Sequence, residues 1–244
     1  MKDALHDIVQ HTIGIGIDLI KVTGTDRTTE INAAAEDRSV ILDVKFHQAI
    51  PEFVGLFGMP NLNKLKIILD IPEYREDAKL SITRQNDSEG NLVPSGINFE
   101  NKIGDFKNNY RFMVANIVAE KLKTVKFRGV NAWDVEVDPP VASIQRMRFQ
   151  SQANSEETTF VAKTNGDKLE FYFGDRSSHA GDFVFYQGIT GKLSSDRLWP
   201  VGIFLTILNL PGDKMIKFSD QGVSQITVDS GLALYSYTIP ALQK

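Results

Sequence analysis

The residues able to bind a metal ion or to act in catalysis are few and widely spaced. The chain has no cysteine, so it offers no thiol nucleophile and no cysteine-based metal site. Its four histidines are His6, His11, His47 and His179, and none of their spacings is typical of a metal site. On a helix, His6 and His11 would lie about 140° apart around the axis. We therefore expect no metal ion and interpret His6 and His11 as solvated side chains of the helix.

Two short segments resemble parts of catalytic or nucleotide-binding motifs without completing them. Gly14 and Gly16 begin like a dinucleotide-binding loop, but the third glycine is missing and a predicted helix, instead of a strand, precedes them. Residues 175–179 combine Asp, Arg, two Ser and His in one loop, whereas catalytic triads assemble from separate segments. We expect the protein not to be an enzyme and to need no cofactor; a hydrolase that uses Asp175 and His179 is the third-ranked alternative.

Composition is typical of a globular protein of one or two domains. Of the 244 residues, 42% are hydrophobic and 24% are charged. The formal net charge of −4 argues against simple charge-driven wrapping of nucleic acid, but an acidic exterior is compatible with a basic inner surface. Every apolar run is interrupted, so no membrane span is expected. The lack of cysteine fits a reducing compartment, and we expect the cytoplasm, or that of the host if the protein is viral.

Hydrophobic periodicity predicts a repeated order of helices and strands in the first half. Residues 3–11 read as a short helix, with Leu5 and Ile8 on one face. After it we expect three strands, at residues 17–23, 27–34 and 39–46. A second short helix at residues 50–57 has Pro51 in its first turn, and strands and turns follow at residues 64–112.

The second half restarts this order after an irregular boundary at residues 115–140, which ends in Pro139 and Pro140. Residues 141–152 predict a helix of poor apolar period, and a strand that begins at Arg146 remains an alternative. A hairpin around Gly166 follows at residues 159–173, and then a further strand at residues 183–187. The chain ends in a helix at residues 198–210 and three strands at residues 213–241.

The two halves therefore share one pattern: helix, strands, helix and hairpins. Each second helix has a proline early and ends before an apolar-proline pair, and lysine-bearing strands are expected after it, with Lys64 and Lys66 in the first half and Lys214 and Lys217 in the second. Sequence identity between the halves is negligible, so the repeat is one of pattern only. The fold class that follows is α+β.

Several stretches carry a resemblance to a known family. In the tail these are Gly-Asp-Lys-Met-Ile-Lys-Phe (212–218), Gln-Ile-Thr-Val-Asp (225–229) and Leu-Tyr-Ser-Tyr-Thr-Ile-Pro-Ala (234–241). In the front half they are residues 11–16, which follow the first helix, and residues 43–46, which lead into residues 50–57. These stretches resemble the DNA sliding clamps of T4-like bacteriophages, a family related in fold to proliferating cell nuclear antigen. The segment 71–110 departs from that pattern by being longer and rich in loops.

The resemblance implies a two-domain sliding-clamp fold with pseudo-symmetric halves, each with two helices packed on curved antiparallel sheets. The N-terminal clamp domain would span residues 1–125, an interdomain connector 126–140 and the C-terminal clamp domain 141–244. Three copies would close head-to-tail into a ring. The ring would encircle double-stranded DNA without sequence preference and tether the replicative DNA polymerase, after an ATP-dependent clamp loader had placed it there.

A ring of this kind needs cations that attract phosphate without reading sequence. The candidates on or near the four predicted helices are Lys2, Lys64, Arg146, Arg148 and Lys214. On a regular helix Arg146 and Arg148 lie about 200° apart, so at most one is expected to face the channel, and Arg146 is slightly favoured. Each of the five could instead be an ordinary solvated cation.

A second surface would bind peptide tails of the polymerase and the clamp loader. The resemblance implies an apolar pocket bordered by the connector, the turn after the last helix and the C-terminal tail, with the residues Val130, Trp133, Pro211, Tyr237, Ile239 and Pro240. A tryptophan in a polar connector is typical of an interaction site, although Trp133 could instead pack on its own domain. The competing interpretation of the whole chain is a β-rich oligomeric phage structural protein of the tail or baseplate.

Overall fold

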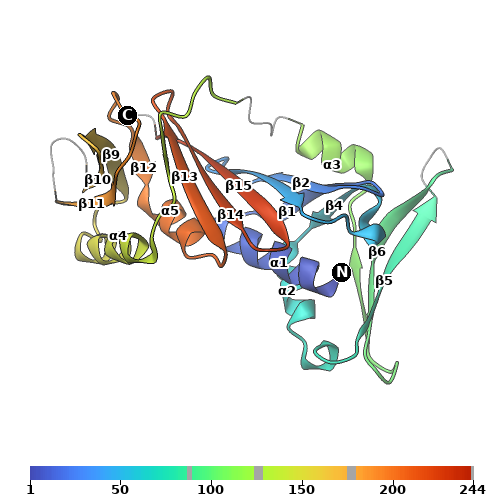
Figure 1. Ribbon diagram of the computed structural model, residues 1–244. Coiled ribbons are helices and arrows are strands. Elements are labelled where there is room, and N and C mark those ends of the chain that lie inside the picture. The colour runs from blue at the N-terminus through green and yellow to red at the C-terminus, as the bar shows by residue number, and fades with distance from the viewer. Residues whose placement is uncertain (87–89, 124–128, 175–179, 243–244) are drawn as a thin grey trace. The chain divides into compact units, whose positions relative to one another are not determined.

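The computed structural model describes residues 1–86, 90–123, 129–174 and 180–242. The chain divides into two compact units, one of Met1–Lys126 with Ser230–Tyr235 and one of Phe127–Asp229 with Ser236–Lys244. Their elements are labelled in Figure 1. Residues 175–179, considered above for a hydrolase, lie outside the described residues, so the structure adds nothing on that alternative.

The first unit is built around an antiparallel sheet, of which four strands in this unit have the order β4-β1-β2-β3. Its strands are β1 (Leu19–Gly24), β2 (Thr29–Ala34), β3 (Ile41–Phe46) and β4 (Gly55–Pro60). The first three confirm the predicted strands. In each of them buried and exposed residues alternate, as in β1 with Ile20 and Val22 fully buried, because successive side chains in a strand point to opposite faces.

Two helices, α1 (Lys2–Thr12) and α2 (Leu62–Leu69), pack together on one face of this sheet (Figure 1). Helix α1 confirms the prediction for residues 3–11, and Leu5 and Ile8 on its inner face are fully buried. Helix α2 begins at Asn61, whose side-chain oxygen accepts a hydrogen bond from the Lys64 N–H at 3.3 Å, an N-cap that satisfies a donor left open by the first turn.

Helix α2 corrects two predictions. Residues 50–57, expected to be a helix, form a short 3-10 turn (Pro51–Phe53) and then the start of β4. Residues 64–69, expected to be a strand, are helical. The alternation of Leu65, Ile67 and Leu69 suggested a strand. The buried residues, however, recur at helical spacing, while Ile67 is 68% exposed; they are Leu62, Leu65, Ile68 and Leu69.

A second, three-stranded antiparallel sheet of order β5-β6-β7 completes the strands of the first unit. It consists of β5 (Lys79–Asn86), β6 (Leu92–Glu100) and β7 (Lys107–Arg111). A further helix, α3 (Ala115–Lys121), packs on β4 through Val118. No helix was predicted there, because the stretch is short and mixed in charge.

A buried polar cluster fixes α1 to the returning segment 230–235 of the same unit. One Asp7 carboxylate oxygen accepts hydrogen bonds from the Ser230 hydroxyl at 2.9 Å and the Tyr235 hydroxyl at 2.7 Å. The other lies 3.3 Å from Nδ1 of His11, whose ring stacks on that of Tyr235 at 4.2 Å. His11 is buried, so its interpretation as a solvated side chain is wrong. Buried polar groups are costly unless they are paired, so this pairing makes the position of the segment specific.

The second unit repeats the arrangement. Its first sheet has the order β11-β10-β9-β12, with β9 (Thr159–Asn165), β10 (Lys168–Phe173), β11 (Gly181–Gln187) and β12 (Leu198–Pro200). Its second has the order β15-β14-β13-β8, with β8 (Val135–Val137), β13 (Asp213–Ser219), β14 (Val223–Asp229) and β15 (Ala233–Pro240). Of β15, only residues 236–240 belong to this unit.

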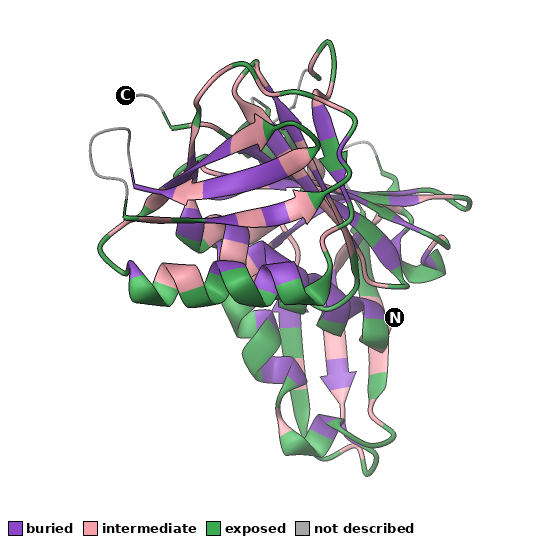
Figure 2. Ribbon diagram, turned by 60° about the vertical axis from the view of Figure 1, so that its left-hand side comes forward, coloured by how far each residue is buried: buried purple, intermediate pink, exposed green. Residues whose placement is uncertain are grey.

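Helices α4 (Val141–Ala153) and α5 (Val201–Leu208) pack against each other in this unit, and α4 also contacts β11. Helix α4 confirms the prediction, and the alternative of a strand from Arg146 is wrong. Its exposed residues run along the side away from the sheet (Figure 2). The predicted helix 198–210 is shorter, because Leu198–Pro200 pair with β9 as β12 and the helix starts only after Pro200.

The element order of the two units is the same, which confirms the predicted pseudo-symmetric plan. Each has a long helix, three antiparallel strands, a fourth strand that pairs with the first of the three, a second helix and then further antiparallel strands. The correct correspondence is β4 and α2 with β12 and α5. The sequence pattern instead pairs residues 50–57 with the last helix, which places Lys64 wrongly on a strand.

Candidate functional site

The lysine at the start of α1 is held by the backbone of its own unit. Nζ of Lys2 donates hydrogen bonds to the carbonyl oxygens of Tyr74 and Arg75, at 2.6 and 2.8 Å. These carbonyls end the short 3-10 turn Pro72–Tyr74. The ammonium group therefore has neutral partners, and its charge is retained.

Helix α2 presents two lysines with different surroundings. Lys66 forms an ion pair with Asp70 one turn later, with Nζ 2.5 Å from the carboxylate, and this hydrogen bond lowers the pKa of Asp70. Lys64 is exposed and, among the residues described, makes no ion pair. The two lysines thus provide one neutralised and one unneutralised cation on the same helix.

The two arginines of α4 lie on different sides of the helix, as their spacing predicts. The guanidinium of Arg146 lies over the Phe183 ring of β11, 5.4 Å from its centroid, a cation–π contact. The guanidinium of Arg148 donates to the Asn209 side chain at the end of α5. Both side chains are exposed and both are oriented by a neutral group.

Lys214, the second residue of β13, folds back onto the turn before it. Nζ donates to the Gly212 carbonyl oxygen at 2.7 Å. Partial burial lowers the pKa of Lys214, and the neighbouring charge of Asp213 opposes that shift.

The five cations named from the sequence therefore share one property. Within the described part of the chain, none of them is paired with a carboxylate, whereas several other lysines are, namely Lys66, Lys102, Lys107, Lys163 and Lys217. A cation that is hydrogen-bonded to a carbonyl, an amide or an aromatic ring keeps its net charge. The five can still attract phosphate.

Helices α2 and α4 also expose apolar side chains. Ile67 of α2 is 68% exposed, and Phe149 and Val141 of α4 are 64% and 70% exposed. Helix α5 has no charged residue between Val201 and Leu208. The exposed sides of α2, α4 and α5 are therefore less basic than a protein would need to follow a phosphate backbone by electrostatic attraction alone.

The residues named for a partner pocket fall into two groups. Tyr237 and Ile239 are fully buried, because alternate residues of β15 point into the core. Their side chains cannot touch a partner in this arrangement. Pro211 and Pro240 are exposed, while Trp133 and Val130 are half-buried, so these four are the accessible members.

The segment that carries Trp133 is fixed to the second unit. The N–H of Asp134 donates to the carbonyl of Phe218 at 2.9 Å, and its carboxylate accepts from the N–H of Asp220 at 2.8 Å. Glycine is needed at position 191, because a Cβ there would lie 1.6 Å from the Asp134 carbonyl oxygen. Trp133 therefore belongs to an ordered segment.

Strand β7 in the first unit and strand β11 in the second are end strands of their sheets, as are β5 and β12. Exposed side chains on them carry opposite charge, Lys107 and Arg111 on β7 and Asp182 on β11. Unpaired backbone groups at an edge are a template for pairing with another chain. These edges could not be identified from the sequence, because strand order within a sheet is not visible in hydrophobic alternation.

Metal-binding and membrane-spanning features are absent from the described residues. No group of three or more His, Asp or Glu side chains is placed to hold a metal ion there. No described helix is long and apolar enough to cross a membrane.

Comparison with solved structures finds extensive similarity over the whole chain. A structure titled as the C-terminal region of FEN-1 bound to PCNA of A. fulgidus matches with a TM-score of 0.71 at 6% identity, covering 100% of this chain and 97% of that one. This chain has the sliding-clamp fold. PCNA of Thermococcus kodakaraensis, at a TM-score of 0.66 and 12% identity, and the PCNA2–PCNA3 complex of Sulfolobus tokodaii, at 0.63 and 13%, each cover 99% of this chain and 97% of theirs.

Sequence comparison gives no such match. No protein-family model matches the chain, and no curated protein matches it. The clamp fold is therefore preserved here with almost no sequence identity, which is consistent with a fold defined by element order and apolar pattern.

Proposed function

We propose that this protein is a sliding clamp, a DNA polymerase processivity factor without catalytic activity of its own. Copies of the chain close into a ring around double-stranded DNA, and the ring tethers the replicative polymerase. Processivity then comes from topology and does not require tight binding.

The observation that carries this proposal is the repeated clamp unit together with the cations on its helices. Each unit places two helices beside a sheet, α1 with α2 in the first unit and α4 with α5 in the second. The five candidate cations on or next to these helices keep their charge; they are Lys2, Lys64, Arg146, Arg148 and Lys214. A few unneutralised cations attract phosphate without selecting a sequence. Contacts that are few and screened by salt allow the ring to slide.

Ring closure would use the edges of β7 and β11. Strand β7 of one copy would pair with β11 of the next, so that Arg111 approaches Asp182. Because the two edges differ, the contact is head-to-tail, and a head-to-tail contact forms either a closed ring or an open filament. We propose a homotrimer.

The partner site would take a short peptide tail from the polymerase or from the clamp loader. Val130, Trp133, Pro211 and Pro240 supply accessible apolar surface in the second unit. A peptide mode is in keeping with the A. fulgidus structure, whose title describes a C-terminal region of FEN-1 bound to PCNA. Titration with a polymerase C-terminal peptide should change Trp133 fluorescence, and an unchanged spectrum would reject Trp133 as a contact.

The finer assignment rests on the sequence resemblance. The stretches 212–218, 225–229 and 234–241 resemble the clamps of T4-like bacteriophages, and we infer from this resemblance that the protein is a clamp of that type. In that setting an ATP-dependent clamp loader would open the ring, and the protein would work in the cytoplasm of the host cell.

Negative-stain images of the purified protein test the proposal directly. We expect rings with a central hole wide enough for duplex DNA. Light scattering at increasing protein concentration should approach the mass of three 27.2 kDa chains. A compact monomer at all concentrations, with no stimulation of primer extension by a polymerase, would reject the proposal.

A further inference from the structure

A pocket in the first unit lies apart in sequence from every residue assigned above, except that Met1 adjoins Lys2. It has a volume of about 320 Å³ and is bordered by the start of α1, the segment that follows β3 and the turn before β15. Its lining includes Met1, Ala4, Phe46, Ile50, Glu52 and Leu232. Ligand pockets start at about 300 Å³, so this one is large enough for a single side chain with its neighbours.

The walls of the pocket are fixed by hydrogen bonds that do not involve a ligand. The N–H of His47 donates to the Leu232 carbonyl at 3.0 Å, and the N–H of Ile50 donates to the buried Thr29 hydroxyl at 2.9 Å. The Ser230 hydroxyl, bonded to Asp7, also accepts from the Leu232 N–H at 3.3 Å. A site held in this way loses little conformational entropy when it binds.

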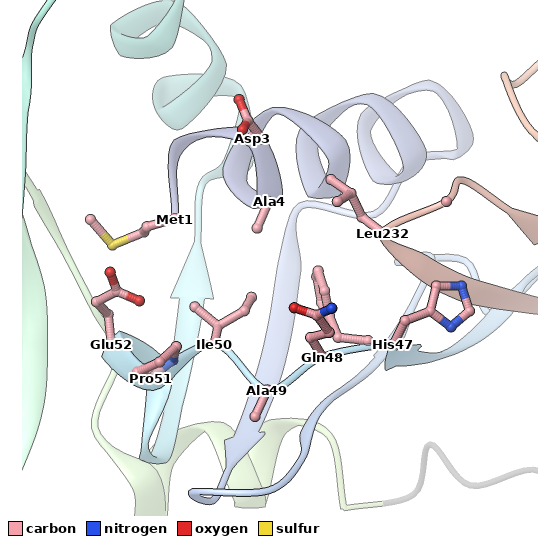
Figure 3. A pocket seen from close by; sticks show the side chains of 12 residues that line it. Met1, Asp3, Ala4, His47, Gln48, Ala49, Ile50, Pro51, Glu52 and Leu232 are labelled. Atoms are coloured by element: carbon pink, nitrogen blue, oxygen red, sulfur yellow. The ribbon is translucent and has the colours of Figure 1, made fainter.

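The lining of the pocket is mixed: apolar side chains alternate with the polar residues His47 and Gln48 and with two acidic residues, Asp3 and Glu52. Figure 3 shows Ala4, Ile50 and Leu232 around the hollow, and the carboxyl group of Glu52 on the side of Met1. The Asp3 carboxyl group points away from Ile50 in the same view. The nearby guanidinium of Arg84 donates to the carbonyl oxygens of Glu52 and Val54 at 3.4 and 3.5 Å. Among the described residues, no cation forms an ion pair with the Glu52 carboxylate.

These features select one class of occupant. The two acidic residues in the lining, Asp3 and Glu52, favour a ligand with a positive charge. An acidic ligand would be repelled by Glu52. We propose that the pocket binds a short peptide segment of a partner protein, with an aliphatic side chain in the hollow and an adjacent lysine or arginine at Glu52.

Methyl NMR on the intact protein can test this, with acetyl-Lys-Leu-Lys-amide as the probe. The Ile50 and Leu232 methyl groups report from the pocket. Those of Ile103, which is 82% exposed, and Leu92, which is 63% exposed, report on unspecific apolar contact elsewhere. We expect saturable shifts at Ile50 and Leu232 and none at Ile103 or Leu92. Acetyl-Glu-Leu-Glu-amide and acetyl-Lys-Gly-Lys-amide should bind at least threefold more weakly.

Two variants separate the charge effect from a general one. Glu52→Lys should weaken binding of the basic peptide roughly threefold or more, since an exposed ion pair contributes about 0.2–1 kcal/mol and its reversal adds repulsion. Glu120→Lys, an equal charge change on exposed α3, should leave it unchanged. Equal binding of the acidic peptide, equal loss in both variants, or larger shifts at Ile103 would overturn the proposal. Shifts at Ile50 that follow protein concentration alone would assign the pocket to a second copy instead.

None of these outcomes depends on ring formation. If the protein failed to form rings but Ile50 and Leu232 still responded to the basic peptide, the pocket would stand while the proposed function fell.

Discussion

At the scale of single residues, the surroundings of each cation matter more than the number of cations. The chain carries 27 Lys and Arg against 31 Asp and Glu, and several lysines are neutralised by carboxylates. The candidate DNA contacts make no ion pair among the described residues, a property that they share with other exposed cations such as Arg84 and Arg197. This property could not be read from the sequence, because it depends on residues far away, such as Tyr74 for Lys2.

Lys64 and Lys66 allow a matched test of that distinction. Lys64→Ala should lower retention on DNA and reduce the slope of log affinity against log salt by up to about 0.9 for each phosphate that the ammonium group neutralises. Lys66→Ala, on the same helix, should have a smaller effect because Asp70 already neutralises the charge. The measurement is retention on nicked circular DNA at several salt concentrations. Equal effects of both variants would show that pairing does not matter.

Tyr172 provides a pH prediction. The hydrogen bond from its hydroxyl to the Glu170 carboxylate, at 2.6 Å, is the main cause that raises its pKa to about 12. A raised folded pKa means that the contribution to stability is complete below the unfolded value of 10.0 and is lost as the pH rises towards 12. The phenolate absorbance that is absent in Tyr172→Phe should therefore titrate near 12.

Circular dichroism at each pH must show that the protein remains folded during this titration. A difference titration centred at the ordinary tyrosine value, in protein that is still folded, would contradict the hydrogen bond.

At the scale of elements, the sequence was informative where apolar alternation is regular and misleading where two periods coincide. Strands β1, β2 and β3 and helices α1 and α4 were predicted. The β4–α2 region was not, because Leu65, Ile67 and Leu69 fit a strand while Leu62, Leu65 and Ile68 fit a helix. The deciding signal was Asn61, an N-cap residue before the run. The pocket role of Tyr237 and Ile239 was implied by the family resemblance alone, whereas both side chains are buried in β15.

The cap at Asn61 can be measured. Asn61 also has a positive φ of 58°, so Asn61→Ala removes the cap and adds a left-handed backbone cost. We expect a decrease of about 1–2 kcal/mol in the free energy of unfolding. Asn61→Gly should lower it by only a few tenths of a kcal/mol, because glycine tolerates the conformation. Denaturant unfolding of both variants checks this, and an equal decrease would rule out the backbone contribution.

The edge of β7 gives a test of assembly. The N–H of Phe112 and the carbonyl of Phe106 bond to the β6 strand and its turn, so by the alternation of an antiparallel ladder the backbone of Asn109 faces outward. Asn109→Pro removes an outward N–H and should convert rings to monomers while the chain stays folded. Asn109→Ala keeps the N–H and should assemble normally. Light scattering after gel filtration distinguishes the two, and assembly of the proline variant would exclude this edge.

At the scale of the whole molecule, the proposed function predicts a topological link. Protein loaded on nicked circular DNA should withstand a salt wash that removes simple phosphate contacts, because the closed ring cannot leave. Cutting the circle once should release it, since the ring can slide off an end. Gel filtration of the DNA before and after cutting measures the bound fraction. Release by salt alone, with no effect of cutting, would argue against encirclement.

The returning segment 230–235 has a consequence for synthesis. Ser230 and Tyr235 hold the Asp7 carboxylate, 223 and 228 residues away along the chain. A ribosome that has made the first 126 residues has therefore not yet made the partners of Asp7 and His11. N-terminal domains generally fold first during translation, but the core of this unit can be completed only after residue 235 has been made. A nascent chain that stalls before residue 230 would leave a charged group buried without its partners and would be a substrate for chaperones or proteases.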